Sequence, residues 1–191
     1  MIGNDIVDLQ HMFNTCDWRR PRFFDKVFTQ KEQALILTSE NQHQMVWLLW
    51  SMKEAAYKVY VQQFGEGFFN PKRLVCELIS NDKGHVKIDE SSYSTTSTIT
   101  EDYVYTIANL TRQKEVNSSI FESKTSSYKS QSSRLKQNFL KTISESERLD
   151  YHALHIQKTV LGVPQIFYDS KKLPLQFSLT HCGRYSGYVM C

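Results

Sequence analysis

Residues 42–63 read QHQMVWLLWSMKEAAYKVYVQQ, and this stretch determines what the rest of the chain must fold around. Its apolar side chains recur every three or four residues, which is the spacing of one face of an α-helix. The members of this apolar stripe are Met45, Leu48, Leu49, Met52, Ala55, Ala56 and Val59. Gly65, Gly67 and Pro71 follow, and such residues end helices. The sequence therefore predicts one long helix that packs through its stripe.

The opposite face of this helix carries a second set of side chains, which are Trp47, Ser51, Glu54, Tyr57 and Lys58. Glu54 and Lys58 are one helical turn apart. Taken alone, they are most simply a solvated ion pair worth roughly a few tenths of a kcal/mol. An acid in mid-helix, on a face that the apolar stripe does not use, is also a candidate for chemistry.

Upstream of the helix, residues 2–9 (IGNDIVDL) place apolar side chains around Asp5 and predict a short strand that ends in acids. An acid at a strand end commonly caps a turn, which is the alternative to a functional role for Asp5. Residues 29–32 (TQKE) form a capping box, which predicts a further helix to about residue 37.

Downstream of the helix the sequence predicts mainly strands. The expected strands are residues 74–79, 85–88, 103–110, 154–158, 165–168, 175–181 and 185–190. Residues 111–133 are rich in Ser, Thr, Lys and Glu, so we expect a mobile loop or insertion over about residues 111–150, with a helix near residues 135–143. The expected fold is one α+β domain over residues 1–191, with an antiparallel sheet packed on the long helix and an enlarged middle insertion.

Composition and charge restrict the class of protein. Hydrophobic residues make up 40% and aromatic residues 13% of the 191 residues, which is enough for a packed core. The formal net charge of +3 is too small for a typical nucleic-acid binder, yet it suits an acidic protein partner or a polyphosphate. The first residues lack a signal-peptide pattern, and the longest apolar block, residues 45–50, is too short to span a bilayer. We expect no nucleic-acid partner and no membrane partner.

The cysteine pattern indicates a reducing compartment. The four cysteines are Cys16, Cys76, Cys182 and Cys191, and no two of them have the C-x-x-C spacing of a zinc site or redox pair. Reduced thiols of this kind favour a cytoplasmic location.

The C-terminal run at residues 177–181 (FSLTH) contains Thr180 and His181, and Gly183 and Arg184 follow it. A hydroxyl, an imidazole, a guanidinium and an unobstructed backbone together suit a phosphate group. A lone His at a strand end is more often only a satisfied polar residue. The cluster at residues 18–22 (WRRPR) is either a further phosphate site or a solvated basic face.

Three separated motifs carry more weight together than alone. In chain order they are residues 2–9 (IGNDIVDL), residues 50–58 (WSMKEAAYK) and residues 177–181 (FSLTH). These motifs and their order resemble the 4′-phosphopantetheinyl transferase superfamily, and within it the single-repeat holo-[acyl-carrier-protein] synthases. The chain departs from the family pattern at Asn4, where an apolar residue is usual, and at Thr180, where a serine is usual.

The resemblance implies transfer of the 4′-phosphopantetheine group of coenzyme A to a serine of an apo acyl or peptidyl carrier protein, with release of adenosine 3′,5′-bisphosphate. It implies Mg²⁺, with Mn²⁺ as an alternative, held by the carboxylates of Asp5 and Glu54. The implied catalytic residues are Glu54 and Lys58, and Glu54, or a metal-bound water beside it, is the implied general base. The residues implied to contact the coenzyme phosphates are Lys58, Thr180 and His181, to which we add Arg184.

Several expectations stay open at this point. Single-repeat members are homotrimers with sites between chains, although the long middle segment could decorate or block that interface. Asp8 either supports the metal site or makes a structural contact. The basic residues 19–26 are a candidate docking surface for an acidic carrier of fatty-acid, polyketide or peptide synthesis. The alternative functions are a non-catalytic coenzyme A or carrier-binding module and an unrelated metal-dependent phosphohydrolase.

Overall fold

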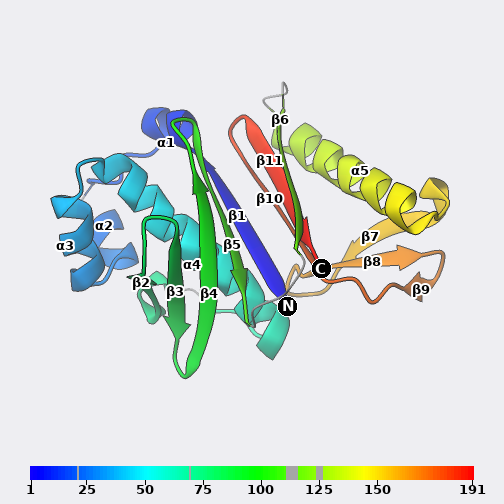
Figure 1. The fold of residues 1–191 in the computed structure, drawn as a ribbon, viewed down its shortest axis with the longest axis horizontal. Coiled ribbons are helices and arrows are strands. Elements are labelled where there is room, and N and C mark those ends of the chain that lie inside the picture. The colour runs from blue at the N-terminus through cyan, green and yellow to red at the C-terminus, as the bar shows by residue number, and fades with distance from the viewer. Residues whose placement is uncertain (21, 69, 111–115, 124–126) are drawn as a thin grey trace.

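The fold combines one long helix with three antiparallel sheets (Figure 1). The computed structural model describes residues 1–20, 22–68, 70–110, 116–123 and 127–191, and the helices and strands are counted over those ranges. Its α-helices are α1 Leu9–Thr15, α2 Phe23–Val27, α3 Gln30–Thr38, α4 Gln42–Phe64 and α5 Tyr128–Glu147. Its strands are β1 Ile2–Asp8, β2 Leu74–Leu78, β3 Lys83–Ile88, β4 Ser91–Ile99, β5 Tyr103–Asn109, β6 Asn117–Glu122, β7 Leu154–Lys158, β8 Pro164–Tyr168, β9 Lys171–Lys172, β10 Phe177–Cys182 and β11 Tyr185–Met190.

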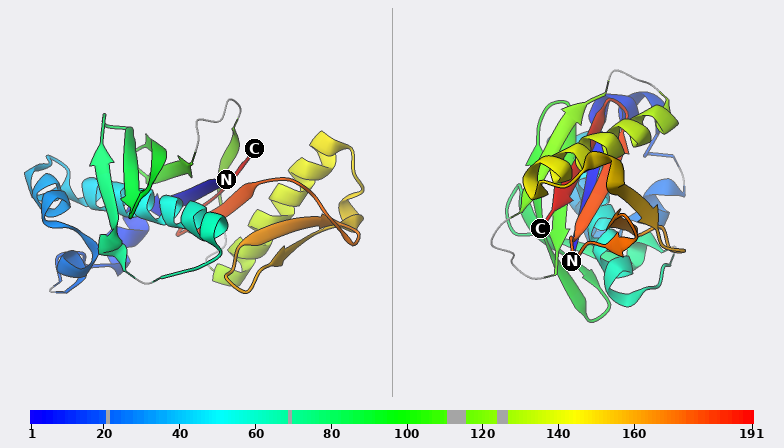
Figure 2. Two further views of the ribbon diagram at one scale, coloured as in Figure 1. Left: turned by 90° about the horizontal axis from the view of Figure 1, so that it is seen from below. Right: turned by 90° about the vertical axis from the view of Figure 1, so that its right-hand side faces the viewer.

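The sheets follow one another along the molecule. A five-stranded sheet of order β1-β5-β4-β3-β2 packs on α4, and a three-stranded sheet of order β10-β11-β6 lies beside its β1 edge. A third sheet, β7-β8-β9, lies with α5 at the end of the molecule opposite to α2 and α3 (Figure 2). All strand pairings are antiparallel. The predicted α+β class, with an antiparallel sheet on a long helix, is confirmed.

The long helix α4 begins and ends as the sequence predicts. The Asn41 side chain accepts a hydrogen bond from the Gln44 N–H at the first turn. Gly65 terminates the helix in the left-handed conformation, with φ of 65°, which glycine adopts without strain. The predicted capping box is also present, because Thr29 and Glu32 exchange their two hydrogen bonds at the start of α3.

The face of α4 opposite the apolar stripe is also largely buried. Trp47 is 1% exposed and lies among the rings of Phe23, His43 and Trp50, and Ser51 is 0% exposed where β1 meets α4. The Ser51 hydroxyl donates to the Asp5 carbonyl at 3.2 Å. At the edge of the apolar stripe, Gly3 lies so close to the Ala55 carbonyl that a Cβ would clash there, so β1 also contacts the stripe. A solvated ion pair therefore does not describe this face, which instead holds β1 and its Asp5.

The mobile loop expected over residues 111–150 is wrong for most of that range, whereas the alternative expectation of an insertion stays a prediction. Residues 117–122 form β6, which pairs with β11, and α5 begins at residue 128 rather than near residue 135. Residues 111–115 and 124–126 lie outside the described residues. The enlargement of this chain relative to single-repeat synthases stays a prediction.

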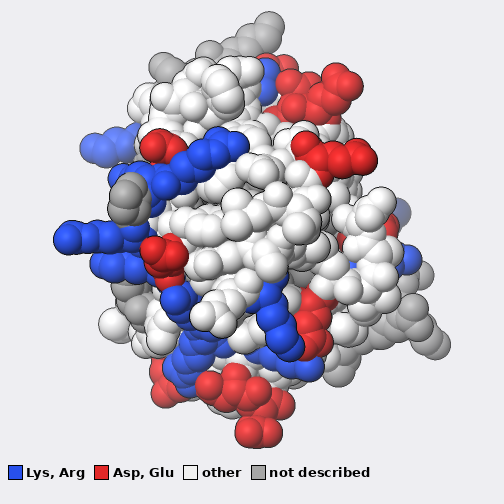
Figure 3. All heavy atoms as spheres, turned by 90° about the vertical axis from the view of Figure 1, so that its left-hand side faces the viewer, with Lys and Arg blue, Asp and Glu red and all other residues white. Residues whose placement is uncertain are grey.

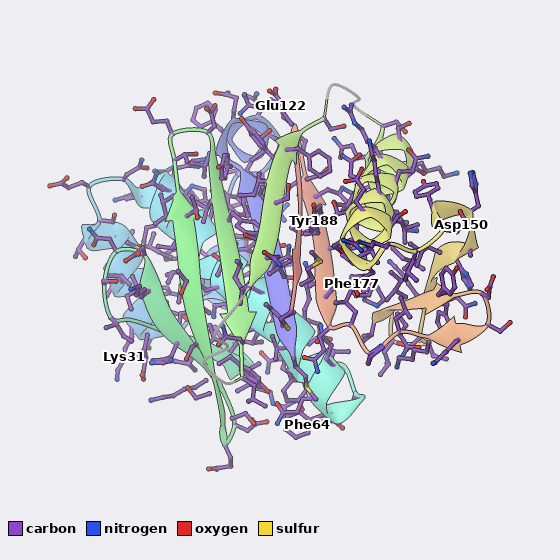
Figure 4. All side chains as sticks on the ribbon, turned by 45° about the vertical axis from the view of Figure 1, so that its right-hand side comes forward. Lys31, Phe64, Glu122, Asp150, Phe177 and Tyr188 are labelled. Carbon is purple, nitrogen blue, oxygen red and sulfur yellow. The ribbon has the colours of Figure 1, made fainter. Side chains whose placement is uncertain are left out.

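A single row of buried side chains holds α5 in place. Leu135, Phe139 and Ile143 lie four residues apart and are at most 2% exposed. Phe139 stacks on Phe177 with ring centroids 4.5 Å apart and also contacts Tyr188. Figure 4 shows Phe177 and Tyr188 on the strands next to α5. The sequence predicts only the part of α5 that carries this row, because the residues of its first two turns are largely polar.

Two simpler observations complete the fold. No helix in the described ranges is both long and apolar enough to cross a membrane. All four cysteines carry free thiols. The cytoplasmic location stays a prediction.

Candidate functional site

The candidate site lies where the free edge of β1 meets β10. Backbone N–H groups of β1 point toward β10, and hydroxyls of β10 accept their hydrogen bonds. Ser178 Oγ accepts from the Asn4 N–H at 3.3 Å, and Thr180 Oγ1 accepts from the Ile6 N–H at 3.2 Å. The first and the last motif of the sequence are therefore neighbours in one chain.

Asp5 lies in the centre of this seam and is only 8% exposed. Its Oδ1 accepts a hydrogen bond from the Thr180 hydroxyl at 3.1 Å and lies 3.5 Å from the Lys58 ammonium. Burial raises the pKa of Asp5, although Lys58 and Thr180 act in the opposite direction. Its second oxygen, Oδ2, is buried and has no hydrogen-bond partner among the described residues. A buried carboxylate oxygen without a partner is costly unless a cation or donor meets it.

Glu54 lies one helical turn before Lys58 on α4 and is partly buried. Burial and the nearby charge of Asp5 raise the pKa of Glu54 to about 7, while Lys58 acts to lower it. The two acids therefore repel each other in the absence of a cation. A group with a pKa near neutrality is also well placed to accept a proton at physiological pH.

His181 closes the site from the β10 side, where its ring contacts the Tyr128 ring with centroids 4.5 Å apart. Burial, followed by the charges of Lys58 and Lys158, lowers the pKa of His181, so the imidazole is neutral near pH 7. Asp5, Lys58, Thr180 and His181 share a cavity of about 360 Å³. Its other lining residues are Tyr57, Val61, Gln62, Tyr128, Ser132, Leu135, Lys136, Lys158, Leu161, Gly162, Val163, Pro164, Ser178 and Leu179.

Arg184 does not line this cavity, in contrast to our expectation that it contacts the coenzyme there. Its Nε and a terminal nitrogen each lie 2.9 Å from a different carboxylate oxygen of Asp8. A further hydrogen bond at 3.3 Å joins Arg184 to Asp102. The guanidinium is thus engaged by carboxylates, and Arg184 lines a neighbouring cavity that also includes Tyr128 and His181. A coenzyme role for Arg184 stays a prediction.

Asp8 makes structural contacts, which was one of the two roles considered for it. It is fully buried, caps α1 by accepting from the His11 N–H at 3.1 Å, and accepts from the Arg184 N–H at 2.8 Å. Burial acts to raise the pKa of Asp8, but the hydrogen bonds from Arg184 outweigh it and hold the pKa below its ordinary value. Asp8 joins the start of α1 to the β10–β11 turn.

The donor set at the seam fits a magnesium ion that a substrate helps to hold. Within the described ranges there is no cluster of three or more His, Cys, Asp and Glu side chains that would form a metal site by itself. Mg²⁺ typically binds one or two protein carboxylates together with phosphate oxygens and waters. Asp5, with its unpartnered Oδ2, lines the cavity, whereas Glu54 does not line it but lies close enough to Asp5 for the charge of Asp5 to raise its pKa. These two carboxylates are the ones that would hold the ion.

Comparison with known proteins identifies the family. The family model described as "ACPS: 4'-phosphopantetheinyl transferase superfamily" matches residues 1–108, more than half of the chain. The chain belongs to the 4′-phosphopantetheinyl transferase superfamily. Among solved structures, the crystal structure of Thermotoga maritima holo-[acyl-carrier-protein] synthase is similar, with 14% identity, a TM-score of 0.42, and coverage of 90% of this chain and 83% of that chain. No curated protein matches the sequence.

The superfamily match divides the site into two parts. Asp5, Glu54 and Lys58 lie inside the matched residues 1–108, whereas Thr180 and His181 lie outside them. In this phosphopantetheinyl transferase superfamily member, one chain nevertheless brings both parts together, because the Thr180 hydroxyl donates directly to Asp5 across 175 residues of sequence.

Four residues of the site escaped the sequence analysis. Ser178 lies within the third motif, but nothing local shows that its hydroxyl receives a β1 N–H. Tyr128, Lys136 and Lys158 line the cavity from α5 and β7. The only signal in the sequence is that Tyr128 and Lys136 are eight residues apart, which places them on one face of α5. Lys158, on β7, has no such signal.

Proposed function

We propose that this protein transfers the 4′-phosphopantetheine group of coenzyme A to a serine of an apo acyl or peptidyl carrier protein, as a holo-[acyl-carrier-protein] synthase does. Superfamily membership supports phosphopantetheinyl transfer in general. The observation that carries the specific proposal is the geometry around Asp5. Its Oδ1 is fixed by Thr180 and Lys58 while its Oδ2 is left without a partner among the described residues, in a carboxylate that lines the cavity.

Each polar group of the site has a role in this reaction. Mg²⁺, held by Asp5 and Glu54, would supply charge neutralisation for the diphosphate of coenzyme A. The Glu54 carboxylate accepts the proton of the carrier serine. The serine oxygen forms a bond to the β-phosphorus, the bond from that phosphorus to the bridging oxygen breaks, and adenosine 3′,5′-bisphosphate leaves. Lys58 pairs with a phosphate oxygen, and neutral His181 donates a hydrogen bond to another.

The single-chain arrangement bears on the oligomeric state. Because the contact between Asp5 and Thr180 is made within one chain, a neighbouring chain is not needed to join the first and third motifs. This supports a site that one chain assembles alone. The homotrimer implied by the resemblance stays a prediction.

The carrier is expected to be acidic, and a basic surface is available for it. Arg19, Arg20, Arg22 and Lys26 are exposed, and Arg19 stacks on Trp18 at 4.0 Å. Figure 3 shows Lys and Arg side chains gathered on this end of the molecule, where α2 and α3 lie. Pro21, in the middle of the cluster, lies outside the described residues. We propose this surface as the docking site for the carrier.

Intact-mass spectrometry tests the proposed function. Apo carrier proteins of fatty-acid, polyketide and peptide synthesis are incubated with the protein, coenzyme A and Mg²⁺, with EDTA in the control. The expected result is a carrier heavier by about one phosphopantetheine unit, and no gain with EDTA. No gain with any carrier would refute transfer and would favour a module that only binds coenzyme A.

The hydroxyl of Thr180 should matter for magnesium because it fixes Asp5. Thr180→Val keeps the shape of the side chain but removes the donor, so we expect about a tenfold rise in the Mg²⁺ concentration for half-maximal transfer, as for loss of one hydrogen bond to a charged group. Thr180→Ser should retain the wild-type value. Ser178→Ala is the matched control, since Ser178 bonds to β1 without contacting Asp5. Equal Mg²⁺ dependence in all four proteins would contradict this role.

The raised pKa of Glu54 predicts a pH-dependent stability. The folded protein keeps the Glu54 proton up to about pH 7, whereas the unfolded chain loses it near 4.5. The resulting stabilisation is full below the lower value and is lost as pH rises through about 7. Without metal, the melting temperature should therefore fall between about pH 4.5 and about pH 7 and level off above that, and Mg²⁺ should restore more of it at and above pH 7 than near pH 4.5. Calorimetry on wild type and Glu54→Gln checks this, because the variant should lose most of the pH slope.

A further inference from the structure

Two lysines reach the cavity from the part of the chain that the superfamily match does not cover. Lys136 projects from α5 and Lys158 stands at the end of β7, while Lys58 lines the same cavity from α4. Lys136 follows Ser132 by one helical turn, and both line the cavity. The wall formed by α5 and β7 is therefore basic and carries a hydroxyl.

These two lysines have no counter-charge in the described part of the protein. In those ranges neither Lys136 nor Lys158 forms a salt bridge, whereas Lys58 is paired with Asp5. Burial aside, the charges of Lys58 and Lys158 lower the pKa of His181, which indicates that Lys158 lies close to that imidazole. Among the described residues, the lining of the cavity thus carries the three lysines Lys58, Lys136 and Lys158 against the one carboxylate of Asp5.

Coenzyme A, the substrate of the proposed function, carries one phosphate group that takes no part in the bond changes of the reaction. Coenzyme A carries a diphosphate, at which the reaction takes place, and a separate 3′-phosphate on its ribose. Asp5, Glu54 and Lys58 account for the diphosphate. A phosphomonoester carries a charge of about −1.5 to −2 near pH 7, which two lysines balance. The charges therefore match if the two lysines without a salt bridge, Lys136 and Lys158, pair with the 3′-phosphate.

We propose that Lys136 and Lys158 together bind the 3′-phosphate of coenzyme A and make this protein prefer coenzyme A to 3′-dephospho-coenzyme A. This inference rests on the proposed function for the identity of the ligand. It adds a specificity determinant that lies outside the three motifs. Ser132 supplies a further donor to the same phosphate from α5.

Isothermal titration calorimetry with Mg²⁺ present tests the inference by binding, independently of transfer. The measured quantity is the ratio of the dissociation constants for 3′-dephospho-coenzyme A and coenzyme A. We expect a ratio of about ten or more for the wild type, as for one or two charge-assisted contacts. Lys136→Met and Lys158→Met should each lower it, and the double variant should bring it to about one. The double Lys→Arg variant should keep a ratio well above one.

Matched controls lie on the same elements or sheet but away from the cavity. Lys141→Met changes an exposed lysine of α5, and Lys171→Met changes an exposed lysine of β9. Both should keep the wild-type ratio. Circular dichroism on each variant confirms that the fold is retained.

The outcomes separate this inference from the proposed function. A wild-type ratio near one, an unchanged ratio in the double methionine variant, or no binding of coenzyme A overturns the inference. If the lysine variants bind coenzyme A and 3′-dephospho-coenzyme A more weakly by the same factor, the inference is also overturned, because the lysines then contact the diphosphate that both ligands share. If the wild type prefers coenzyme A, the double methionine variant loses that preference, and the wild type modifies no carrier, the inference is kept and the proposed transferase function is refuted.

Discussion

Glu54→Gln should reduce the rate of phosphopantetheinyl transfer by about 10²–10⁴-fold, the usual worth of a positioned general base. Glutamine has nearly the same shape but cannot accept the serine proton and brings no charge to a cation. Glu54 is only partly buried, and burial together with Asp5 raises its pKa to about 7. Its replacement should therefore leave the fold intact and should even relieve repulsion with Asp5 above neutral pH. Carrier modification followed by intact mass, alongside thermal unfolding, measures both effects.

The magnesium dependence distinguishes a base from a ligand. If Glu54 only helped to hold the cation, a high Mg²⁺ concentration would restore the rate of Glu54→Gln, as it should partly do for Asp5→Asn. Loss that persists at saturating Mg²⁺ identifies Glu54 as the base. Glu40→Gln, at an exposed acid just before α4, is the control and should behave as wild type. Full activity of Glu54→Gln at saturating Mg²⁺ would remove Glu54 from the mechanism.

Elements whose signals are local can be predicted from the sequence. The α4 helix carries both its periodic apolar stripe and its end signals within one short stretch, so the sequence predicts its start to the residue and its end to within one. The capping box of α3 and the strands β7 and β11 are local in the same way. These patterns do not depend on which distant segment each element meets.

Elements defined by distant partners escape such prediction. The strand β4 reads SSYSTTSTI, whose inward positions are largely small and polar, with Tyr93, Thr95 and Ser97 buried. It is a strand because β3 and β5 pair with it on both sides. The β6 strand depends on β11, about seventy residues away, in the same manner. Hydrophobic alternation, the signal for a half-buried strand, is absent from both.

At the site, too, the sequence predicts which residues matter better than it predicts which residues they contact. The motifs and their family resemblance single out Asp5, Glu54 and Lys58, which the structure brings together. The sequence neighbours of Arg184 suggest a phosphate as its partner, yet that partner is Asp8, 176 residues away. The pairing requires the turn between β10 and β11 to meet the end of β1, which no short stretch of sequence encodes.

Lys53→Met should lower the free energy of unfolding by about 3–5 kcal/mol, the usual cost of leaving one partner of a buried ion pair alone. Lys53 precedes Glu54 in the same motif but points into the core, where its side chain is 3% exposed and that of Glu32 is 1% exposed. Its ammonium lies 2.9 Å from Glu32 and donates to the carbonyls of Pro71 and Leu74 at 3.0 Å and 2.6 Å. All three of its donors are thus used to join α3, α4 and the start of β2.

The Glu32 carboxylate is equally committed, because its other oxygen accepts from the Cys76 N–H at 2.8 Å. Removing the lysine alone therefore buries an uncompensated charge, whereas Lys53→Met combined with Glu32→Gln should recover part of the loss. Urea unfolding of both variants measures this, with Lys31→Met at an exposed position of α3 as the control. If Lys53 instead acted on a phosphate, its replacement would slow transfer and leave stability unchanged. A loss of several kcal/mol with the motif's Glu54 still in place would show that adjacent residues of one motif serve the fold and the chemistry separately.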